Sequence, residues 1–113
     1  MSELSNESCI PCRGGIPPLT EAEYLPLLES LNQSWEVINN HHLKKDYTFK
    51  DYKSTVAAVN LIAEISESEN HHPNISFTWG KLTVTIWSHK IDGLTKSDFI
   101  LAAKINDGFE TKD

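Results

Sequence analysis

The sequence predicts an α+β domain in which three helices pack on one face of a four-stranded antiparallel sheet, in the order α-β-β-α-β-β-α. Apolar residues recur at a helical period in three segments, and they alternate with polar residues in four short segments between these. A chain of 113 residues suits one hydrophobic core. We assign residues 19–108 to a single domain, with a flexible arm at 1–18 and a short tail at 109–113.

The first helix is predicted over residues 19–31. Thr20 followed by Glu23 forms a capping box, and Leu19 and Tyr24 have the spacing of a hydrophobic staple. An apolar stripe follows at helical spacing, made of Tyr24, Leu27, Leu28 and Leu31. The start and the buried face of this helix are therefore both encoded locally.

Two strands and a long helix come next. The strands are expected over 35–38 and 43–49, on either side of a polar, turn-like segment at 39–42. The helix is predicted over 51–69, where the apolar positions Tyr52, Val56, Val59, Ile62 and Ala63 fall near a period of 3.6. It should stop before Pro73, because the residue preceding proline disfavours helical backbone angles.

A hairpin and a last helix complete the fold. Segments 74–79 and 82–87 alternate cleanly, and we place their turn at Gly80 and Lys81. In that register Asn74 lies opposite Trp87, which brings His89 to the corner before the hairpin. The last helix is expected to start after Thr95 as its N-cap. The uncovered edge strands favour self-association.

Composition excludes some classes of partner. The formal net charge of −6 argues against nonspecific binding to nucleic acid or to an anionic membrane. No apolar run reaches the length of a membrane span, and no signal peptide is evident, so we expect a cytoplasmic protein. A mature form of an organelle precursor is also compatible with these features.

Two cysteines, Cys9 and Cys12, form a C-x-x-C pair in the N-terminal arm. Such a pair can be redox-active or can supply half of a zinc site. Zinc needs four ligands, and the only nearby candidates, His41 and His42, do not have the spacing of a zinc finger. We therefore favour two reduced thiols in a polar arm.

Three histidines stand at predicted structural transitions, His71 and His72 after the long helix and His89 after the last strand. Adjacent residues point in different directions, which disfavours a metal site, although an irregular corner leaves a three-histidine site open. Histidine titrates near neutral pH, so the three rings could instead move protons. A purely structural alternative is that the helix dipole favours histidine at a helix C-terminus.

Two acidic residues accompany the histidines. Glu67 lies four residues before His71 on the same helical face, so it could hold a ring nitrogen of that histidine or remain a solvated charge. Asp98 is expected at N3 of the last helix, where an acidic residue is stabilising without any catalytic role. Aromatic packing is the default interpretation for Trp79 and Trp87.

At these residues the sequence resembles the pterin-4a-carbinolamine dehydratase family. The family pattern is a charged residue, His-His-Pro, an aromatic residue, a histidine and an aspartate at fixed gaps, here Glu67, His71, His72, Pro73, Trp79, His89 and Asp98. The segments 17–23 and 93–98 also look like the family. The resemblance covers roughly residues 17–106, with Ser88 and Asp92 as small departures.

The resemblance implies a hydro-lyase that dehydrates 4a-hydroxytetrahydrobiopterin to quinonoid dihydrobiopterin during tetrahydrobiopterin recycling, without a cofactor. By position, His71 and His89 would be the acid–base pair, and His72 would mainly bind and orient the pterin. Pro73 and Trp79 would help to form the substrate site. Glu67 and Asp98 would be supporting residues.

The resemblance also implies partners. A homodimer or homotetramer is expected, with a functional link to an aromatic amino-acid hydroxylase that makes the carbinolamine. Animal members serve as a dimerisation cofactor for a homeodomain transcription factor, so a non-enzymatic binding module of the same fold is the alternative. A dehydratase-like protein of molybdopterin metabolism that has lost the activity is a third possibility, and the intact histidines argue against that loss.

Overall fold

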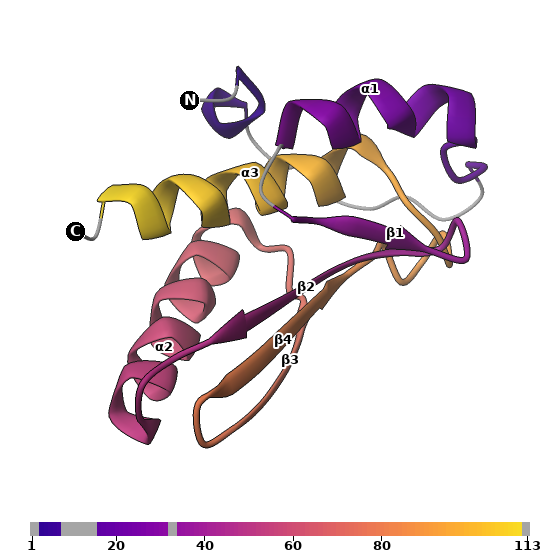
Figure 1. Ribbon diagram of the computed structural model, residues 1–113. Coiled ribbons are helices and arrows are strands. Elements are labelled where there is room, and N and C mark those ends of the chain that lie inside the picture. Colours follow the sequence, from indigo (N-terminus) through magenta and orange to yellow (C-terminus); the bar gives the residue numbers. More distant parts are fainter. Residues whose placement is uncertain (1–2, 8–15, 32–33, 112–113) are drawn as a thin grey trace.

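The computed structural model describes residues 3–7, 16–31 and 34–111, and it confirms the predicted α+β fold (Figure 1). Cys9 and Cys12 lie outside the described residues. The elements are η1 (Glu3–Asn6), α1 (Glu21–Leu31), β1 (Glu36–Ile38), β2 (His42–Thr48), α2 (Tyr52–Glu69), β3 (Asn74–Thr78), β4 (Lys81–Ile86) and α3 (Lys96–Thr111). Helix α3 continues past the predicted domain end at residue 108.

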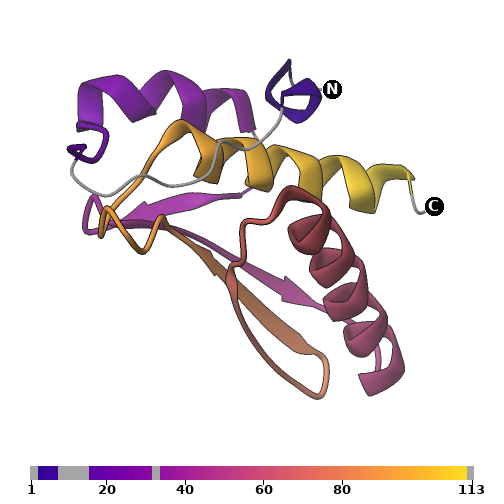
Figure 2. The ribbon, with the colours of Figure 1, turned by 180° about the vertical axis from the view of Figure 1, so that it is seen from behind.

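The sheet has the strand order β1-β2-β4-β3, and all of its neighbouring strands are antiparallel. Helices α1, α2 and α3 lie on the same side of it, as the two opposite views show (Figures 1 and 2). The inward row pairs Leu43 with Ile86 and Tyr47 with Leu82. The outward row is polar, with Lys44 opposite Thr85 and Asp46 opposite Thr83, which is the alternation of a sheet with one covered face.

Helix α3 forms the centre of the core. It contacts η1, α1 and α2, and its side chains are almost completely buried over most of the first three turns, at Ser97, Asp98, Phe99, Ile100, Leu101, Ala102, Ala103, Ile105 and Asn106. A helix that is apolar on most sides must be covered on most sides. The sheet and the other helices do this, so the start of α3 is held firmly inside the molecule.

The N-terminal segment contributes to that cover. Within the region that we predicted as an arm, η1 places Leu4 in the core with 5% of its surface exposed. The Lys104 ammonium group donates to the Ser5 carbonyl oxygen at 2.9 Å, and Lys96 pairs with Glu7 at 2.9 Å. These contacts attach η1 to the outer side of α3.

The capping box of α1 is confirmed, because the Thr20 N–H donates to the Glu23 carboxylate at 2.8 Å and the Glu23 N–H donates to the Thr20 hydroxyl at 3.4 Å. The β1–β2 turn is also where we expected it. Asn39 and Asn40 have φ values of 53° and 55°, the left-handed region that short hairpin turns need and asparagine tolerates. The Tyr24 hydroxyl donates to the Asn40 side chain, which ties this turn to α1.

The register predicted for the second hairpin is wrong by two residues. Its turn lies at Trp79 and Gly80, so that Asn74 pairs with Thr85 rather than with Trp87. Gly80 occupies the second position of this loop and has φ of 72°. Glycine adopts such a positive φ without the steric cost that a Cβ would bring. A shift by two residues leaves every side chain on its original face, so hydrophobic alternation could not distinguish the two registers.

Helix α2 ends where it was predicted to end. Asn70 adopts a left-handed conformation with φ of 52° and ψ of 40°, and its N–H donates to carbonyl oxygens of the last turn. The His71 N–H donates to the Ser66 carbonyl oxygen at 3.1 Å. This C-cap turns the chain out of the helix, so His71, His72 and Pro73 form the link to β3.

The N-cap of α2 gives a pH-dependent prediction. The Asp51 carboxylate accepts from the Ser54 N–H at 2.7 Å, and the backbone and then the side chain of Ser54 lower the pKa of Asp51. A depressed folded-state pKa stabilises the protein above the unfolded-state pKa, and that contribution is lost as pH falls through the folded-state value. We expect Asp51→Ala to melt at a lower temperature than the wild type at pH 7, with the difference shrinking below about pH 4.

Asp51→Ser is the matched control, since its hydroxyl can cap the helix without titrating. The melting difference between this variant and the wild type should be small at pH 7. A difference between the alanine variant and the wild type that stays constant from pH 7 to pH 3 would contradict the role of the carboxylate charge.

Candidate active site

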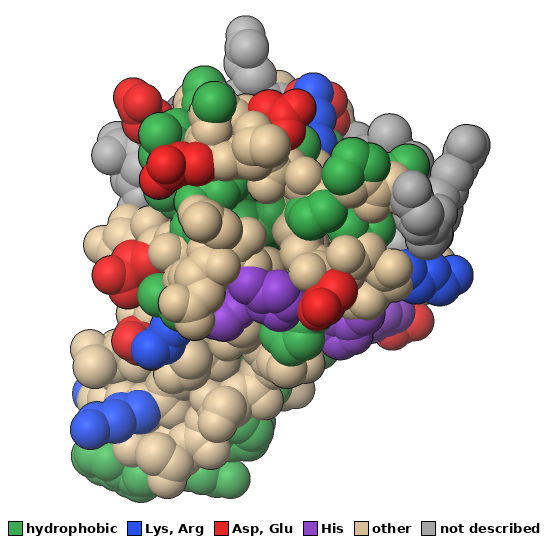
Figure 3. Space-filling model, turned by 90° about the vertical axis from the view of Figure 1, so that its right-hand side faces the viewer, with side chains coloured by type: hydrophobic (Ala, Val, Ile, Leu, Met, Phe, Trp, Pro, Cys, Tyr) green, Lys and Arg blue, Asp and Glu red, His purple; other side chains and the backbone are tan. Residues whose placement is uncertain are grey.

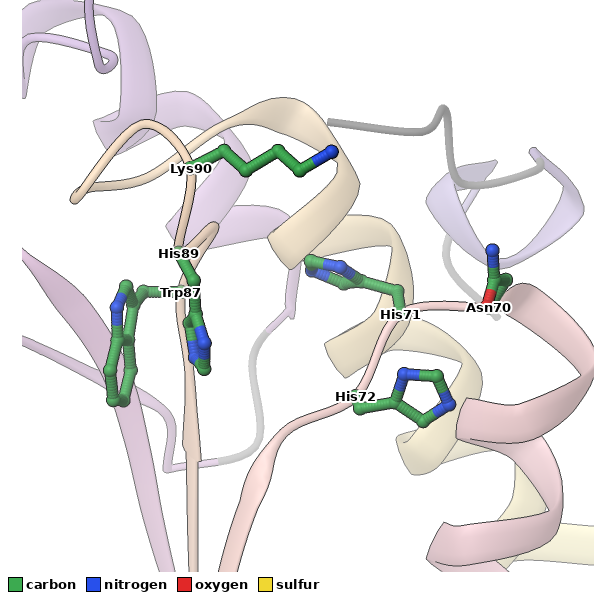
Figure 4. A pocket seen from close by; sticks show the side chains of 6 residues that line it. All are labelled: Asn70, His71, His72, Trp87, His89 and Lys90. Atoms are coloured by element: carbon green, nitrogen blue, oxygen red, sulfur yellow. The ribbon is translucent and has the colours of Figure 1, made fainter. Parts of the chain in front are cut away.

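A pocket of about 280 Å³ opens at the end of the sheet where α2 leads into β3 and β4 leads into α3. Its lining comes from these two connections and consists of Asn70, His71, His72, Trp87, His89 and Lys90 (Figure 4). Histidine side chains form a band across the middle of the corresponding side of the molecule (Figure 3). The prediction that His71, His72 and His89 border one cavity is confirmed.

His71 is anchored by a buried carboxylate. Its Nε2–H donates to Asp98 Oδ1 at 2.6 Å, and the exposed fractions of the two side chains are 12% and 0%. Because an ionised carboxylate only accepts hydrogen bonds, this contact fixes which ring nitrogen of His71 carries a hydrogen. The Nδ1 atom of the same ring is therefore the one available for proton exchange.

The second oxygen of Asp98 is also fully used. Oδ2 accepts from the Thr95 N–H at 2.8 Å and from the Ser88 hydroxyl at 3.0 Å. The Ser88 and Thr95 hydroxyl groups are themselves 2.9 Å apart. A buried charge is tolerated when hydrogen bonds replace its lost hydration, so these donors stabilise the carboxylate. Asp98 thereby caps α3, as predicted, and also holds His71.

A compact loop presents His89. Ser88 and Gly93 pair as an isolated antiparallel bridge, which closes the loop between β4 and α3. Gly93 has no room for a side chain, because a Cβ there would lie 2.5 Å from Pro18 Cβ. Asp92 in this loop adopts φ of 56°, in the left-handed region that glycine adopts most readily.

The other two histidines of the pocket are held less firmly. His72 Nε2–H donates to Glu67 Oε2 at 3.2 Å, and both side chains are exposed. Of the two alternatives left open for Glu67, a contact with His71 or a solvated charge, neither describes it fully, because this exposed carboxylate contacts His72. The reason is the left-handed Asn70, which breaks the helical spacing between Glu67 and His71. His89 is exposed, and its ring lies beside that of Trp87 with centroids 4.4 Å apart.

Two residues of the predicted substrate site do not line this pocket. Trp79 lies in the turn at the opposite end of the hairpin with 64% of its surface exposed. Pro73 is half-buried in the link between His72 and β3. The tryptophan that borders the pocket is Trp87. With the observed register, Trp87 follows β4 and lies opposite His72. The sequence signal for it was its predicted place opposite Asn74, beside the corner that carries His71 and His72.

The arrangement suits acid–base chemistry on a flat ligand. The pocket offers three imidazoles, an indole, an amide and one ammonium group, and among the described residues that line it there is no carboxylate. Imidazole both accepts and donates protons near neutral pH. Within the described residues, no set of three or more His, Cys, Asp or Glu side chains converges as a metal site would require.

Replacement of Asp98 tests the buried network. Asp98→Ala would leave His71, Ser88 and the Thr95 N–H without their acceptor, and each unsatisfied buried group is costly. We expect a loss of about 2–3 kcal/mol in the free energy of unfolding, measured by urea denaturation. Asp98→Asn is the matched control, because its amide oxygen can still accept from Thr95, and its loss should be smaller. A loss under about 0.5 kcal/mol for the alanine variant would contradict this account.

Known proteins are similar to this chain over most of its length. A relative from Rubrobacter xylanophilus is 45% identical over 106 residues, covering 94% of this chain and 98% of its own. One from Rickettsia bellii is 50% identical over 103 residues, covering 91% of each chain. Both are provisionally named pterin-4-alpha-carbinolamine dehydratase.

A solved structure is also similar. The transcriptional coactivator/pterin dehydratase from Brucella melitensis superposes with a TM-score of 0.73 at 26% identity, covering 80% of this chain and 97% of that one. The family model described as pterin 4 alpha carbinolamine dehydratase matches residues 17–108, which is most of the sequence. The chain therefore belongs to the pterin 4 alpha carbinolamine dehydratase family.

Proposed function

We propose that this protein dehydrates 4a-hydroxytetrahydrobiopterin to quinonoid dihydrobiopterin. The observation that supports this most is the set of three histidines on one pocket, with His71 fixed by the buried Asp98 at 2.6 Å. The family and the names of its relatives point to the same substrate class.

The reaction removes water across the C4a–N5 bond of the pterin. One group protonates the C4a hydroxyl so that the C–O bond breaks and water leaves. Another group removes the N5 proton, and its electron pair forms the C4a–N5 double bond. The acid thus loses one proton and the base gains one. Return of a proton from the base to the acid through solvent restores the starting state, and no redox change occurs.

We assign the proton transfers to His71 and His89, which border the pocket from different connections. Asp98 accepts from Nε2–H of His71 and so leaves Nδ1 of that ring to exchange protons with the substrate. A carboxylate orients a catalytic histidine in the same way in other enzymes. His72, with Glu67 behind it, would bind and orient the pterin. Two imidazoles across a flat heterocycle would exchange protons with it over short distances.

The proposal also covers the metabolic role, the cellular location and the oligomeric state of the protein. Recycling of tetrahydrobiopterin implies a hydroxylase that supplies the carbinolamine, and a cytoplasmic location is included in the proposal. A homodimer or homotetramer is part of the proposal as well. Among the described residues, none of the helices has the length and apolarity that crossing a bilayer requires.

A protein-binding role is the second candidate. An apolar groove of about 210 Å³ is lined by Phe49, Ser54, Ala57, Ala58, Leu61 and Phe109, and the similar Brucella protein carries a coactivator title. The decay of enzymatically generated carbinolamine, followed by ultraviolet absorbance with and without the protein, separates the two roles. Unchanged decay would favour the binding role.

Replacement of the proposed acid and base gives a direct test. His71→Ala and His89→Ala should each lower kcat by about a hundredfold, the usual scale for a positioned acid or base. The measurement is carbinolamine decay at pH 7 with purified variants whose melting temperatures have been checked.

Lys53→Ala is the matched control, because Lys53 is exposed on the first turn of α2 and is not part of the pocket lining. Its kcat should equal that of the wild type. Wild-type turnover in both histidine variants, with the fold intact, would overturn the assignment.

A further inference from the structure

His89 differs from the other pocket histidines in how its ring is held. His71 donates to Asp98 and His72 donates to Glu67. Within the described part of the chain, no hydrogen bond to the His89 ring is found. Its one ring contact there is with Trp87, at 4.4 Å between centroids and 33° between planes. An exposed side chain without a polar anchor samples several rotamers, so this contact is what limits the His89 ring.

Trp87 is in turn held by the β1–β2 hairpin. Leu43 pairs with Ile86, so the next position on each strand brings His42 beside Trp87. The centroid of the Trp87 ring lies 5.9 Å from that of His42 and 5.4 Å from that of His41. The two histidines contact each other through their Nδ1 atoms at 3.0 Å. Trp87 therefore belongs to a cluster of four rings, His41, His42, Trp87 and His89, which we call the ring cluster.

The same hairpin reaches the loop that carries His89. His41 Nε2–H donates to Asp92 Oδ1 at 2.8 Å, across a surface where the Asp92 side chain is 86% exposed. An exposed contact of this kind adds little to stability, even between charged groups. Its position matters more, since it connects the β1–β2 turn to the loop closed by Ser88 and Gly93.

From this geometry we infer that Trp87 is a positioning residue, which holds the His89 ring in its proton-transfer orientation and is itself held by His41 and His42. Burial, and then the neighbouring His41 and Lys44, lower the pKa of His42, so that ring is neutral at pH 7 and packs against the indole without a charge. The inference rests on the proposed function, because it assigns the orientation of one of its two proton-transfer groups.

Two variants separate positioning from simple contact with the substrate. Trp87→Ala removes the ring and should lower kcat about tenfold or more while KM changes little, because misorientation of a catalytic group acts on the chemical step. Trp87→Phe keeps an aromatic wall and should recover most of the lost kcat. A rise in KM with unchanged kcat would overturn the inference, since Trp87 would then only bind substrate.

A second readout does not depend on turnover. Stacking against the Trp87 indole should shift the ring protons of His89 upfield in the NMR spectrum of the wild type, with His89→Ala providing the assignment. The shift should vanish in Trp87→Ala and persist in part in Trp87→Phe. Unshifted His89 protons in the wild type would overturn the inference even if Trp87→Ala fails to fold.

His41→Ala tests the support from the hairpin without touching the pocket lining. It should reduce the upfield shift of His89 and lower kcat by up to about fivefold, the scale of one exposed ion pair. If the chemical shifts of the His89 ring protons do not change in His41→Ala, the inference that the β1–β2 hairpin supports Trp87 is overturned. If the wild type does not accelerate carbinolamine decay, the proposed function fails, while the NMR result still decides whether Trp87 orients His89.

Discussion

The geometry of this protein depends on one buried carboxylate. Asp98 accepts hydrogen bonds from His71 in the link after α2, from Ser88 just after β4 and from Thr95 just before α3. Burying a charge costs free energy unless donors replace its hydration, so these three segments must meet at one point for the fold to be stable. The same requirement places His71 on the pocket. Stability of the α3 N-terminus and orientation of a histidine are thus two results of one set of contacts.

The three pocket histidines differ in how firmly they are held. A fully buried carboxylate holds His71, an exposed carboxylate holds His72, and a neighbouring indole holds His89. The anchors therefore differ in kind, since two of the rings are held through hydrogen bonds to carboxylates and the third through contact with an aromatic ring. His72 and His89 are also the exposed members of the set, whereas the His71 side chain is only 12% exposed.

Much of the secondary structure could be predicted from local sequence signals. The capping box at Thr20 and Glu23, the turn asparagines and the helix end before Pro73 all depend on neighbouring residues. The contacts that define the site join residues far apart in the sequence, so local signals do not reveal them. The hairpin register was wrong because a slip by two residues preserves every face. Trp79 was assigned to the substrate site on the family resemblance, and Trp87 lies at the corner before β3 in either register. The partner of Glu67 changed because Asn70 adopts a left-handed conformation, which sequence alone does not require of an asparagine.

The close approach of Pro18 to Gly93 has an evolutionary consequence. A Cβ at position 93 would lie within 2.5 Å of the proline ring, so a larger residue there is tolerated only if the segment ahead of α1 moves away. The Leu19 N–H donates to the Leu94 carbonyl oxygen at 2.8 Å, which opposes such a movement. Positions 18 and 93 should therefore co-vary among homologues, and drift in the N-terminal segment would be limited by a loop more than seventy residues away.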